Sequence, residues 1–513
     1  MAEVGFPLTG VDPNSPNPGT VRELLVAQSP TGTGGGNDDV LIYGNKTSAG
    51  SETVDVLGEP IVDLADCINR FGRRSEVTWM YRKFIAIPQE ATVYAIAATE
   101  AGTAATRTYT FATAASGASS VVIEWGGYKT FAQIASGDTA ITVAAAVVAA
   151  IAAWENGDMP FTAAVGSNPN EHVVTVTTAN TGDRTQNILA RLRMTFSKTV
   201  AMTVSTGAVG GGATADDFTA AYAQAAAKTI PWQINPKIDA SPSATDNGMG
   251  EGAAYITTQS LPVNGKEQFM CFGCVGSNSA AVTQATTLNN VWCQIVWAEN
   301  NPWTPGMIAA HYVAAVRSKV LGHPAANLTG YAPSGSSIFQ IPRPYDVADY
   351  PTATEKTAAL NNGIVPIDFD NLGKPSIWRD ITSRSLLSSG INDYRAREAC
   401  IPRGLRAFWQ EIARRWAGQK QQFVAADPIR GQKPLADVTY PSSVKKMVQD
   451  TMTDMAGAWI GGSPLLDPGS LAAMVASVDV RLIAGGISVK CNPIVVTHLL
   501  KGQFLVGESS PAY

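Results

Sequence analysis

The stretch AITVAAAVVAAIAAW at residues 140–154 places the strongest single limit on what this chain can fold into. It carries no charge, but a helix that crosses the hydrocarbon core of a bilayer needs about 20 consecutive apolar residues. Asp138 precedes the run and Glu155 follows it, so the run is too short to be a membrane span. Asp138 or Thr139 can cap a helix here, and the alanines allow close packing. We therefore predict a buried helix that packs on a sheet.

The length and composition predict a multidomain assembly subunit. A chain of 513 residues is too long for one core and implies about three domains. The first ten residues, MAEVGFPLTG, lack the pattern of a secretory signal, so we expect a protein made in the cytoplasm without a membrane anchor. Only 15% of residues are charged, which suggests that other chains cover much of the surface.

Charge and cysteine content argue against two further classes of protein. The net charge of −5 provides no basic stripe for a nucleic acid. The six cysteines are scattered, and we expect them to be reduced. Cys271 and Cys274 form a CxxC pair inside an apolar run without a second pair nearby, which favours a buried strand over a redox or metal site.

The pattern of apolar residues changes several times along the chain. Strand, helix and strand patterns from Val40 predict an α/β domain, and Thr-rich alternation with a period of two begins after Glu100. That alternation predicts a β-rich insertion that includes the alanine helix. The predicted organisation is an N-terminal arm at 1–38, the first part of an α/β core at 39–100, an inserted β-rich surface domain at 101–212, the second part of the core at 213–375, an α+β C-terminal domain at 376–497 and a C-terminal arm at 498–513.

Two amphipathic helices are predicted in the C-terminal domain, one from residue 402 and one from residue 441. Each places apolar residues on one face: Leu405, Phe408, Trp409, Ile412 and Trp416 on the first, and Val444, Met447, Val448, Met455 and Trp459 on the second. Strands are predicted at 478–484, 487–496 and 501–507.

No motif in the sequence assembles a catalytic site. The four histidines lie in unrelated contexts, and the GxSxG, HExxH and GxxxxGK[ST] patterns are missing. The acidic residues Asp368 and Asp370 are interpreted as parts of turns. We therefore predict no enzyme activity, no catalytic residues, no cofactor and no metal.

Two stretches carry a resemblance to a known family. NNPWTPGMIAAHYVAAVRSKVLGHPAANLTGYAPSG at 300–335 and EKTAALNNGIVPIDFDNLGKPSIWRDITS at 355–383 resemble segments of the tail sheath proteins of contractile-tailed bacteriophages, especially the Mu-type sheath family. His323 departs from the acidic residue that the family usually has there. VLIYGN at 40–45 and the insertion also fit. The residues that carry the second match are Glu355, Leu360, Asn362, Gly363, Ile364, Gly373, Ile377, Arg379, Ile381 and Thr382, with Asp393 and Tyr394 following.

The resemblance implies a virion protein that polymerises as stacked hexameric rings around a tail tube and contracts to drive the tube through the host envelope. Its implied fold is a subtilisin-like α/β core, a sheet flanked by helices, with the inserted domain, the α+β C-terminal domain and extended arms. Its implied partners are further copies in a six-fold helical array, the tail tube protein, and the baseplate and tail terminator proteins. Such a core also suggests a hydrolase, but the sparse histidines argue against activity.

We predict two kinds of contact for such a subunit. Strand exchange through flexible arms would link neighbours, with joints at 29–38 and near Asn492 and Pro493, although the last strand pairing within its own domain remains an alternative. Residues of the donated strands are Val21, Arg22, Glu23, Leu24, Leu25 and Val26, and Gln503, Phe504, Leu505 and Val506. A helix of the C-terminal domain would contact the tube through Lys445 and Lys446, or through Arg414 and Arg415.

Other interpretations of the sequence remain open. The arm at 1–38 is rich in proline and glycine, and it would equally suit a terminus without fixed structure. The chain could be a secreted β-rich hydrolase or surface-layer protein, against which the missing signal peptide argues. It could also be another virion tail component, such as a tube or baseplate protein.

Overall fold

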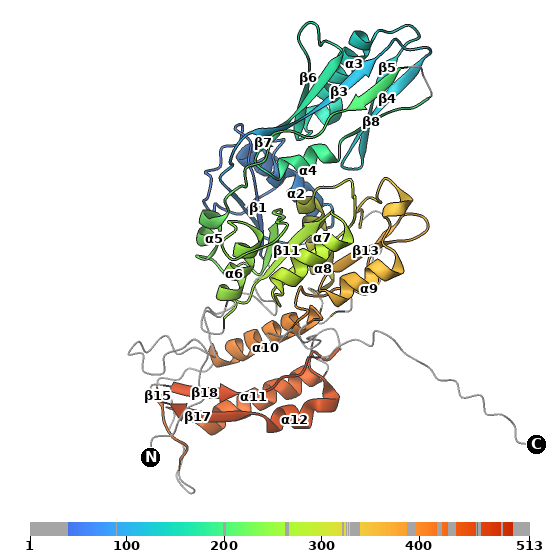
Figure 1. The fold of residues 1–513 in the computed structure, drawn as a ribbon. Helices are drawn as coiled ribbons and strands as arrows, with labels where there is room; N and C mark the ends of the chain where they lie inside the picture. The colour runs from blue at the N-terminus through green and yellow to red at the C-terminus, as the bar shows by residue number, and fades with distance from the viewer. Residues whose placement is uncertain are drawn as a thin grey trace, which may run out of the picture.

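The structure is a computed structural model in which three regions follow one another along its long axis (Figure 1). An elongated β-rich region lies at one end, a sheet covered by helices lies in the middle, and a smaller helical region lies at the other end. The residues described are 39–88, 90–198, 202–261, 266–320, 323, 324, 326, 328, 339–386, 397–417, 423–428, 438–457, 459, 463–483 and 486–495.

The middle region is built on a seven-stranded sheet with the order β14-β13-β12-β11-β10-β1-β2. Every neighbouring pair is parallel except β13 with β14. Five of the strands are buried at every residue, which is why they read as continuous apolar runs. The strands are β1 (Val40–Gly44), β2 (Val93–Ala97), β10 (Trp232–Asn235), β11 (Phe269–Cys274), β12 (Cys293–Trp297), β13 (Val365–Phe369) and β14 (Pro375–Ile377).

Helices cover both faces of this sheet. Alternation along β1 sends Val40 and Ile42 to one face and Leu41 and Tyr43 to the other, and each pair belongs to a separate apolar cluster. The first face carries α1 (Leu64–Phe71), α2 (Glu76–Ile85) and α8 (Pro305–Val320). The second carries α5 (Thr219–Ala225), α6 (Met249–Gln259), α7 (Asn278–Leu288) and α9 (Ala353–Asn361), and the short 3-10 helix η2 (Val347–Asp349) precedes α9.

The β-rich region is inserted between β2 and β10 and contains two antiparallel sheets. One sheet has the order β6-β7-β3-β9 and the other β5-β4-β8. Its elements are β3 (Ala104–Ala112), β4 (Ser119–Trp125), β5 (Tyr128–Ile134), α3 (Ala140–Ala153), the 3-10 helix η1 (Trp154–Gly157), β6 (Phe161–Val165), β7 (Val173–Thr181), α4 (Thr185–Ala190), β8 (Arg193–Phe196) and β9 (Thr203–Thr206).

The alanine-rich run forms α3, and the expectation of a wholly buried helix is wrong. One stripe, with Val143, Val147 and Ile151, is buried in the core, whereas the side chain of Ile141 is 51% exposed. Among the described residues, Ala140–Gly157 is the one helical window long and apolar enough to cross a membrane by composition. It includes a kink where Glu155 and Asn156 have positive φ, and its apolar stripe packs within the domain.

The region at the other end contains α10 (Cys400–Ala417), α11 (Pro441–Ala456) and α12 (Leu471–Ala476). The predicted apolar faces are confirmed, because Phe408 and Ile412 of α10 are fully buried with Val448 of α11 in one cluster. The remaining elements are β15 (Phe423–Val424), β16 (Val438–Thr439), the 3-10 helix η3 (Pro468–Ser470), β17 (Asp479–Ile483) and β18 (Gly486–Lys490).

The strand predicted at 487–496 is shorter than expected. β18 ends at Lys490, ahead of Asn492 and Pro493, and proline has no amide hydrogen to continue a ladder. Val495 then makes an isolated bridge to Leu466. The arm strands predicted at 21–28 and 501–507 lie outside the described residues.

Candidate functional site

The order of the strands places a crevice at the carboxyl ends of β1 and β10. The chain passes from β1 to β2 on one side and, after the insertion, returns to β10 on the other side. In open α/β sheets, ligands bind at such a switch point, outside the carboxyl ends of the strands. Asn45 follows β1 and Asn235 ends β10, so the side chains around these two residues decide what this crevice can hold.

The inserted region places a buried arginine in this crevice. Arg184 immediately precedes α4, and its side chain is only 5% exposed. Its guanidinium lies 2.5 Å from Oε2 of Glu76 and 3.1 Å from Oδ2 of Asp216, and it also donates to the side-chain oxygen of Asn45. Arg184 therefore lies beside Asn45 at the carboxyl end of β1, in the switch-point crevice.

The backbone before Arg184 is shaped for this contact. Gly182 has a φ of +89°, and a Cβ added there would lie 2.2 Å from both carboxylate oxygens of Asp216. A side chain at Gly182 is excluded by both conformation and space. Thr185 Oγ1 donates to the Gly182 carbonyl at 2.6 Å, which fixes the turn between β7 and α4.

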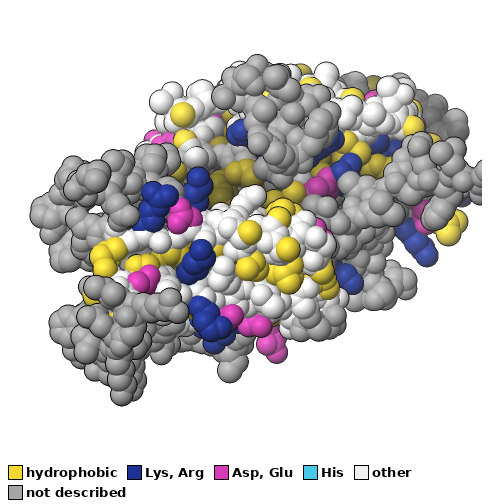
Figure 2. Space-filling model, turned by 90° about the horizontal axis from the view of Figure 1, so that it is seen from below, with side chains coloured by type: hydrophobic (Ala, Val, Ile, Leu, Met, Phe, Trp, Pro, Cys, Tyr) yellow, Lys and Arg dark blue, Asp and Glu magenta, His cyan; other side chains and the backbone are white. Residues whose placement is uncertain are grey.

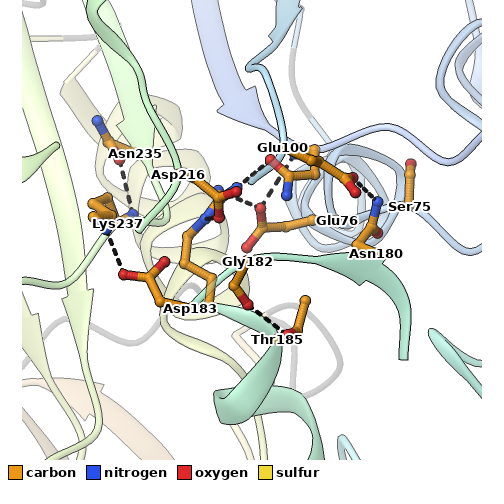
Figure 3. Close-up of polar contacts among 12 residues, drawn as sticks. Ser75, Glu76, Glu100, Asn180, Gly182, Asp183, Thr185, Asp216, Asn235 and Lys237 are labelled. Carbon is orange, nitrogen blue, oxygen red and sulfur yellow. Dashed lines mark hydrogen bonds and ion pairs between the residues drawn. The ribbon is translucent and has the colours of Figure 1, made fainter. Parts of the chain in front are cut away.

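A second buried cation stands beside the first. Lys237 follows β10 and is fully buried, with Nζ 2.5 Å from Asp183 and 3.5 Å from Asp239. Its backbone amide donates to Asn235 Oδ1 at 2.8 Å. Figure 3 shows Lys237 and Asp183 pointing toward each other beside the group formed by Glu76, Glu100 and Asp216.

The helix N-terminus that faces this edge of the sheet is already capped. Free amides at such a terminus commonly bind phosphate. In α6 the amide of Met249 donates to Asp239 at 2.7 Å, and those of Gly250 and Glu251 donate to Asp246 at 2.8 and 3.1 Å. The protein's own carboxylates thus take the place of an anionic ligand.

These groups form what we call the junction cluster. It holds two cations and five carboxyl groups, namely Arg184, Lys237, Glu76, Glu100, Asp183, Asp216 and Asp239. Burial raises the pKa of Glu76 to about 7, although Arg184 opposes the shift, and burial also raises the pKa of Glu100 and of Asp239. The cluster contains more carboxyl groups than cationic side chains. Its carboxyl groups therefore keep a proton at a higher pH than exposed carboxyl groups do.

The junction cluster predicts that stability falls as the pH rises from about 5 to 7.5. Because the pKa of Glu76 is higher in the folded chain, the folded state holds the extra proton below about pH 7, and this contribution is lost above it. We expect Glu76→Gln to reduce the fall in the free energy of unfolding over this pH range by roughly 1–3 kcal/mol. Urea denaturation followed by tryptophan fluorescence measures that free energy. Glu59→Gln, at an exposed glutamate, serves as the control. Equal slopes for the wild type and Glu76→Gln would contradict this assignment.

Two further contacts anchor the insertion to the core. Asp158 pairs with Arg73 at 2.9 Å and with Arg82 at 2.5 Å. At the β4–β5 turn, Trp303 Nε1 donates to the Gly126 carbonyl at 2.9 Å. Together with Arg184, these contacts fix the insertion to the core at several places.

A buried lysine lies beneath the same turn. Lys83 Nζ lies 4.4 Å from the ring centroid of Trp303 and 4.7 Å from that of Tyr128, whose hydroxyl it reaches at 3.2 Å. Burial lowers the pKa of Lys83 to about 8. The aromatic rings supply cation–π attraction to the lysine, which thus joins α2 to the insertion.

A similar network attaches the C-terminal domain. Arg403 of α10 pairs with Asp380, and both side chains are at most 5% exposed. Tyr312 and Gln294 each donate to Asp380 at 2.6 Å. An arginine thus crosses each of the two boundaries of the core and meets buried carboxylates there.

The residues predicted to contact a tube lie on α10 and α11. Lys445 is exposed, and the side chain of Lys446 is 76% exposed with Asp450 at 3.2 Å. Arg414 and Arg415 both pair with Glu411, and Arg415 also joins α10 to α11 through Asp454 at 2.7 Å. The lysines are therefore the better candidates for an external contact. The predicted strand residues, Val21 to Val26 and Gln503 to Val506, lie outside the described residues.

The side chains of His311, Cys271 and Cys274 have structural roles. His311 is buried, with Nδ1 2.8 Å from the Lys83 carbonyl and Nε2 accepting from the Gln340 amide. Cys271 and Cys274 lie in β11 as predicted, but on opposite faces of the sheet, and burial raises the pKa of both thiols. Among the described residues, no cluster of His, Cys, Asp or Glu could hold a metal ion.

One acidic residue was misassigned from the sequence. Asp370 accepts backbone amides in a turn, as predicted, but Asp368 lies within β13 and pairs with Lys356 at 2.9 Å. The junction cluster itself was also missed. Its one signal in the sequence is the charged pair Asp183 and Arg184 next to Gly182, at the end of a Thr-rich strand with few charges.

Comparisons with known proteins give matches among solved structures. No family model matches the chain, and no curated protein matches it. The chain is similar to a sheath tail protein from Desulfitobacterium hafniense, with 12% identity, a TM-score of 0.43, and coverage of 92% of this chain and 99% of that one. A sheath tail protein from Listeria innocua shows 12% identity, a TM-score of 0.44, and coverage of 91% and 97%. A chain of the anti-feeding prophage baseplate shows 12% identity, a TM-score of 0.41, and coverage of 93% of this chain and 95% of that one.

Proposed function

We propose that this chain is a structural subunit of a contractile phage tail sheath, or of a related phage-tail-like particle. The carrying observation is the way its parts are joined: an insertion enters between β2 and β10, and the core then continues into a separate α+β domain. The stretches that resemble the sheath family build α8, α9, β13 and β14, at one side of the core sheet. The resemblance therefore falls on the framework of the core.

A structural role is supported by the state of the switch-point crevice. In a hydrolase or nucleotide-binding protein of this topology the crevice would receive a ligand. Here Arg184 and Lys237 fill it with ion pairs inside the protein, and the carboxylates of Asp239 and Asp246 cap α6. These contacts favour a non-enzymatic subunit over the hydrolase alternative.

In the proposed assembly, subunits form stacked six-membered rings around a tail tube. The several attachments of the insertion and the Arg403–Asp380 pair would let each subunit move as a unit during contraction. Links between subunits would come from strand exchange, in which residues of the arms pair with a sheet edge of a neighbour. β17 and β18 form a two-stranded sheet in the described residues, close in the chain to the C-terminal arm, and so offer edges of this kind.

Contact with the tube is proposed for Lys445 and Lys446 of α11. Exposed ion pairs are each worth about 1 kcal/mol or less, so such a contact can release during contraction. Charge reversal of both lysines to glutamate is expected to leave the fold intact and to abolish co-sedimentation of the sheath with tail tubes. The control is charge reversal at Arg481, an arginine on β17, by substitution with glutamate. Unchanged co-sedimentation of the lysine variant would rule out this contact.

Electron microscopy of the purified full chain tests the proposed function. The expected result is hollow tubes with six-fold end views, alone or on added tail tubes. The proposed partners are the tail tube, baseplate and tail terminator proteins, the proposed location is the virion tail, and the proposed site of synthesis is the bacterial cytoplasm. Particles that stay monomeric at high concentration, even with tubes present, would contradict the proposal.

A further inference from the structure

The four-stranded sheet of the insertion has two open edges. Its order is β6-β7-β3-β9, so β6 and β9 are the edge strands, and within the described residues neither of them pairs with a further strand on its outer side. Figure 1 shows β6 at the outer margin of the β-rich region. An edge strand presents unpaired backbone N–H and C=O groups, and these groups can pair with another chain.

Other edges of this molecule carry features that discourage such pairing. In the core sheet, Ile61 bridges the edge strand β2, and the edge strand β14 begins with Pro375. In the second sheet of the insertion, β5 carries the exposed Lys129 and β8 begins with Arg193. Figure 2 shows charged side chains across the described surface at the opposite end of the molecule. In contrast, β6 and β9 read FTAAV and TVST, with no charge and no proline.

The hydrogen bonds of β6 show which of its backbone groups point away from the sheet. In an antiparallel pair, residues that bond the partner strand alternate with residues whose N–H and C=O point the other way. The carbonyl of Pro160 and the amide of Gly166 both bond β7, each at 2.9 Å. The alternation therefore turns the backbone groups of Phe161, Ala163 and Val165 outward.

The backbone of β9 offers matching groups at the other edge. The amide of Gly207 donates to the carbonyl of Thr108 on β3 at 2.8 Å. By the same alternation, Val204 and Thr206 turn their N–H and C=O groups outward. Each edge therefore has a row of donors and acceptors at the spacing that the other requires.

The two edges also match in direction and in side-chain face. All neighbouring strands of this sheet are antiparallel, so β6 and β9 run in opposite directions. Val204 lies opposite the buried Phe111, and Ala163 lies opposite the buried Val176, so the outward-bonding residues of both edges direct their side chains to the core face. Strand β6 of one copy can therefore extend the sheet of another copy without exchanging its two faces.

We propose that β6 of one copy pairs antiparallel with β9 of a second copy, so that the sheets of neighbouring insertions join edge to edge. Val165 then lies opposite Val204, and Ala163 lies opposite Thr206. This register covers Val165, which is 42% exposed, with the half-buried Val204. The contact is head-to-tail, because every copy carries both edges. The inference rests on the proposed function, since assembly brings the copies together, and it adds a contact between insertions to the links made by the arms.

Disulfide trapping tests the pairing. The full chain carrying Val165→Cys and Val204→Cys is assembled and mildly oxidised. Opposed residues of this kind have Cα atoms about 5.5 Å apart, within the range of a disulfide. Within one copy β6 and β9 are three strand spacings apart, about 14 Å, so a disulfide between positions 165 and 204 must join two copies. The expected result is a ladder of covalent multimers on a non-reducing gel, with the 165–204 link found by mass spectrometry.

The control for trapping combines Val204→Cys with Gln133→Cys, at an exposed position on β5 of the other sheet, and should give no ladder. Tubes that form without the 165–204 link, or with links between two copies of position 165 only, would overturn the inference and leave the proposed function standing. Wild-type protein that never assembles contradicts the proposed function and this inference with it.

A charge on the edge measures the importance of the contact. Val165→Lys is expected to raise the protein concentration needed for assembly at least about tenfold, because the pairing would enclose the ammonium group between two copies. The circular dichroism spectrum should not change. Phe131→Lys, at a 52% exposed position on β5, is the matched control. Assembly of Val165→Lys at the wild-type concentration would also overturn the inference.

Discussion

Replacing Arg184 with methionine is expected to lower the free energy of unfolding by about 3–5 kcal/mol. The methylene groups are kept, but Glu76 and Asp216 lose the cation that lies 2.5 and 3.1 Å from them. Both carboxylates would remain buried without compensation, which is the costly way to break an ion pair. Urea denaturation followed by circular dichroism measures the change, and hydrogen exchange locates it at the boundary between the insertion and the core.

Arg73→Met is the matched control for Arg184→Met. Arg73 also pairs with a carboxylate across this boundary, but its side chain is 53% exposed, so its loss should cost about 1 kcal/mol or less. Adding Glu76→Gln to Arg184→Met should recover part of the stability, because one uncompensated carboxylate is removed. Equal losses for Arg73→Met and Arg184→Met would show that burial does not govern this junction.

Deleting residues 498–513 is expected to abolish tube formation and to leave a folded monomer. The deletion removes the proposed donated strand at 501–507, whereas the described part of the C-terminal domain ends at Val495, which bridges Leu466. The described residues of this domain form an apolar cluster of their own, and we expect that cluster to keep the domain folded without the arm. Circular dichroism checks the fold, and negative-stain electron microscopy checks assembly.

Deletion of residues 509–513 alone is the control for the arm. It shortens the chain but keeps the strand at 501–507, so tubes should form as they do from the wild type. If the longer deletion also gives normal tubes, the C-terminal strand is not the link between subunits. A protein that loses its folded spectrum would instead show that the strand completes its own domain, which is the alternative left open by the sequence.

The local elements were largely predictable from the sequence. The runs around Val40 and Cys271 are buried strands, as the apolar pattern predicts. The alternating insertion forms antiparallel strands, and α10 and α11 bury the predicted faces. Each of these features depends on the spacing of apolar residues within a short window, which a sequence shows directly.

The candidate site was not predictable in the same way. Arg184, Glu76 and Lys237 are far apart in the chain and have no motif spacing, so only the strand order brings them to one crevice. The half-exposed helix α3 and the strand position of Asp368 were missed for a related reason. Composition gives the apolar content of a segment, but its neighbours decide which face is covered.

The sequence by itself determined where strands and helices form, because hydrophobic period and turn residues act over a few positions. It also determined the division of charge between residues 1–375 and 376–513, which is a matter of counting. The tertiary structure alone decided that buried ion pairs occupy the switch-point crevice, that an arginine crosses each boundary of the core, and that Val62 is exposed. Those features depend on contacts between distant residues, whose energies arise only when the sheet order removes charges from water.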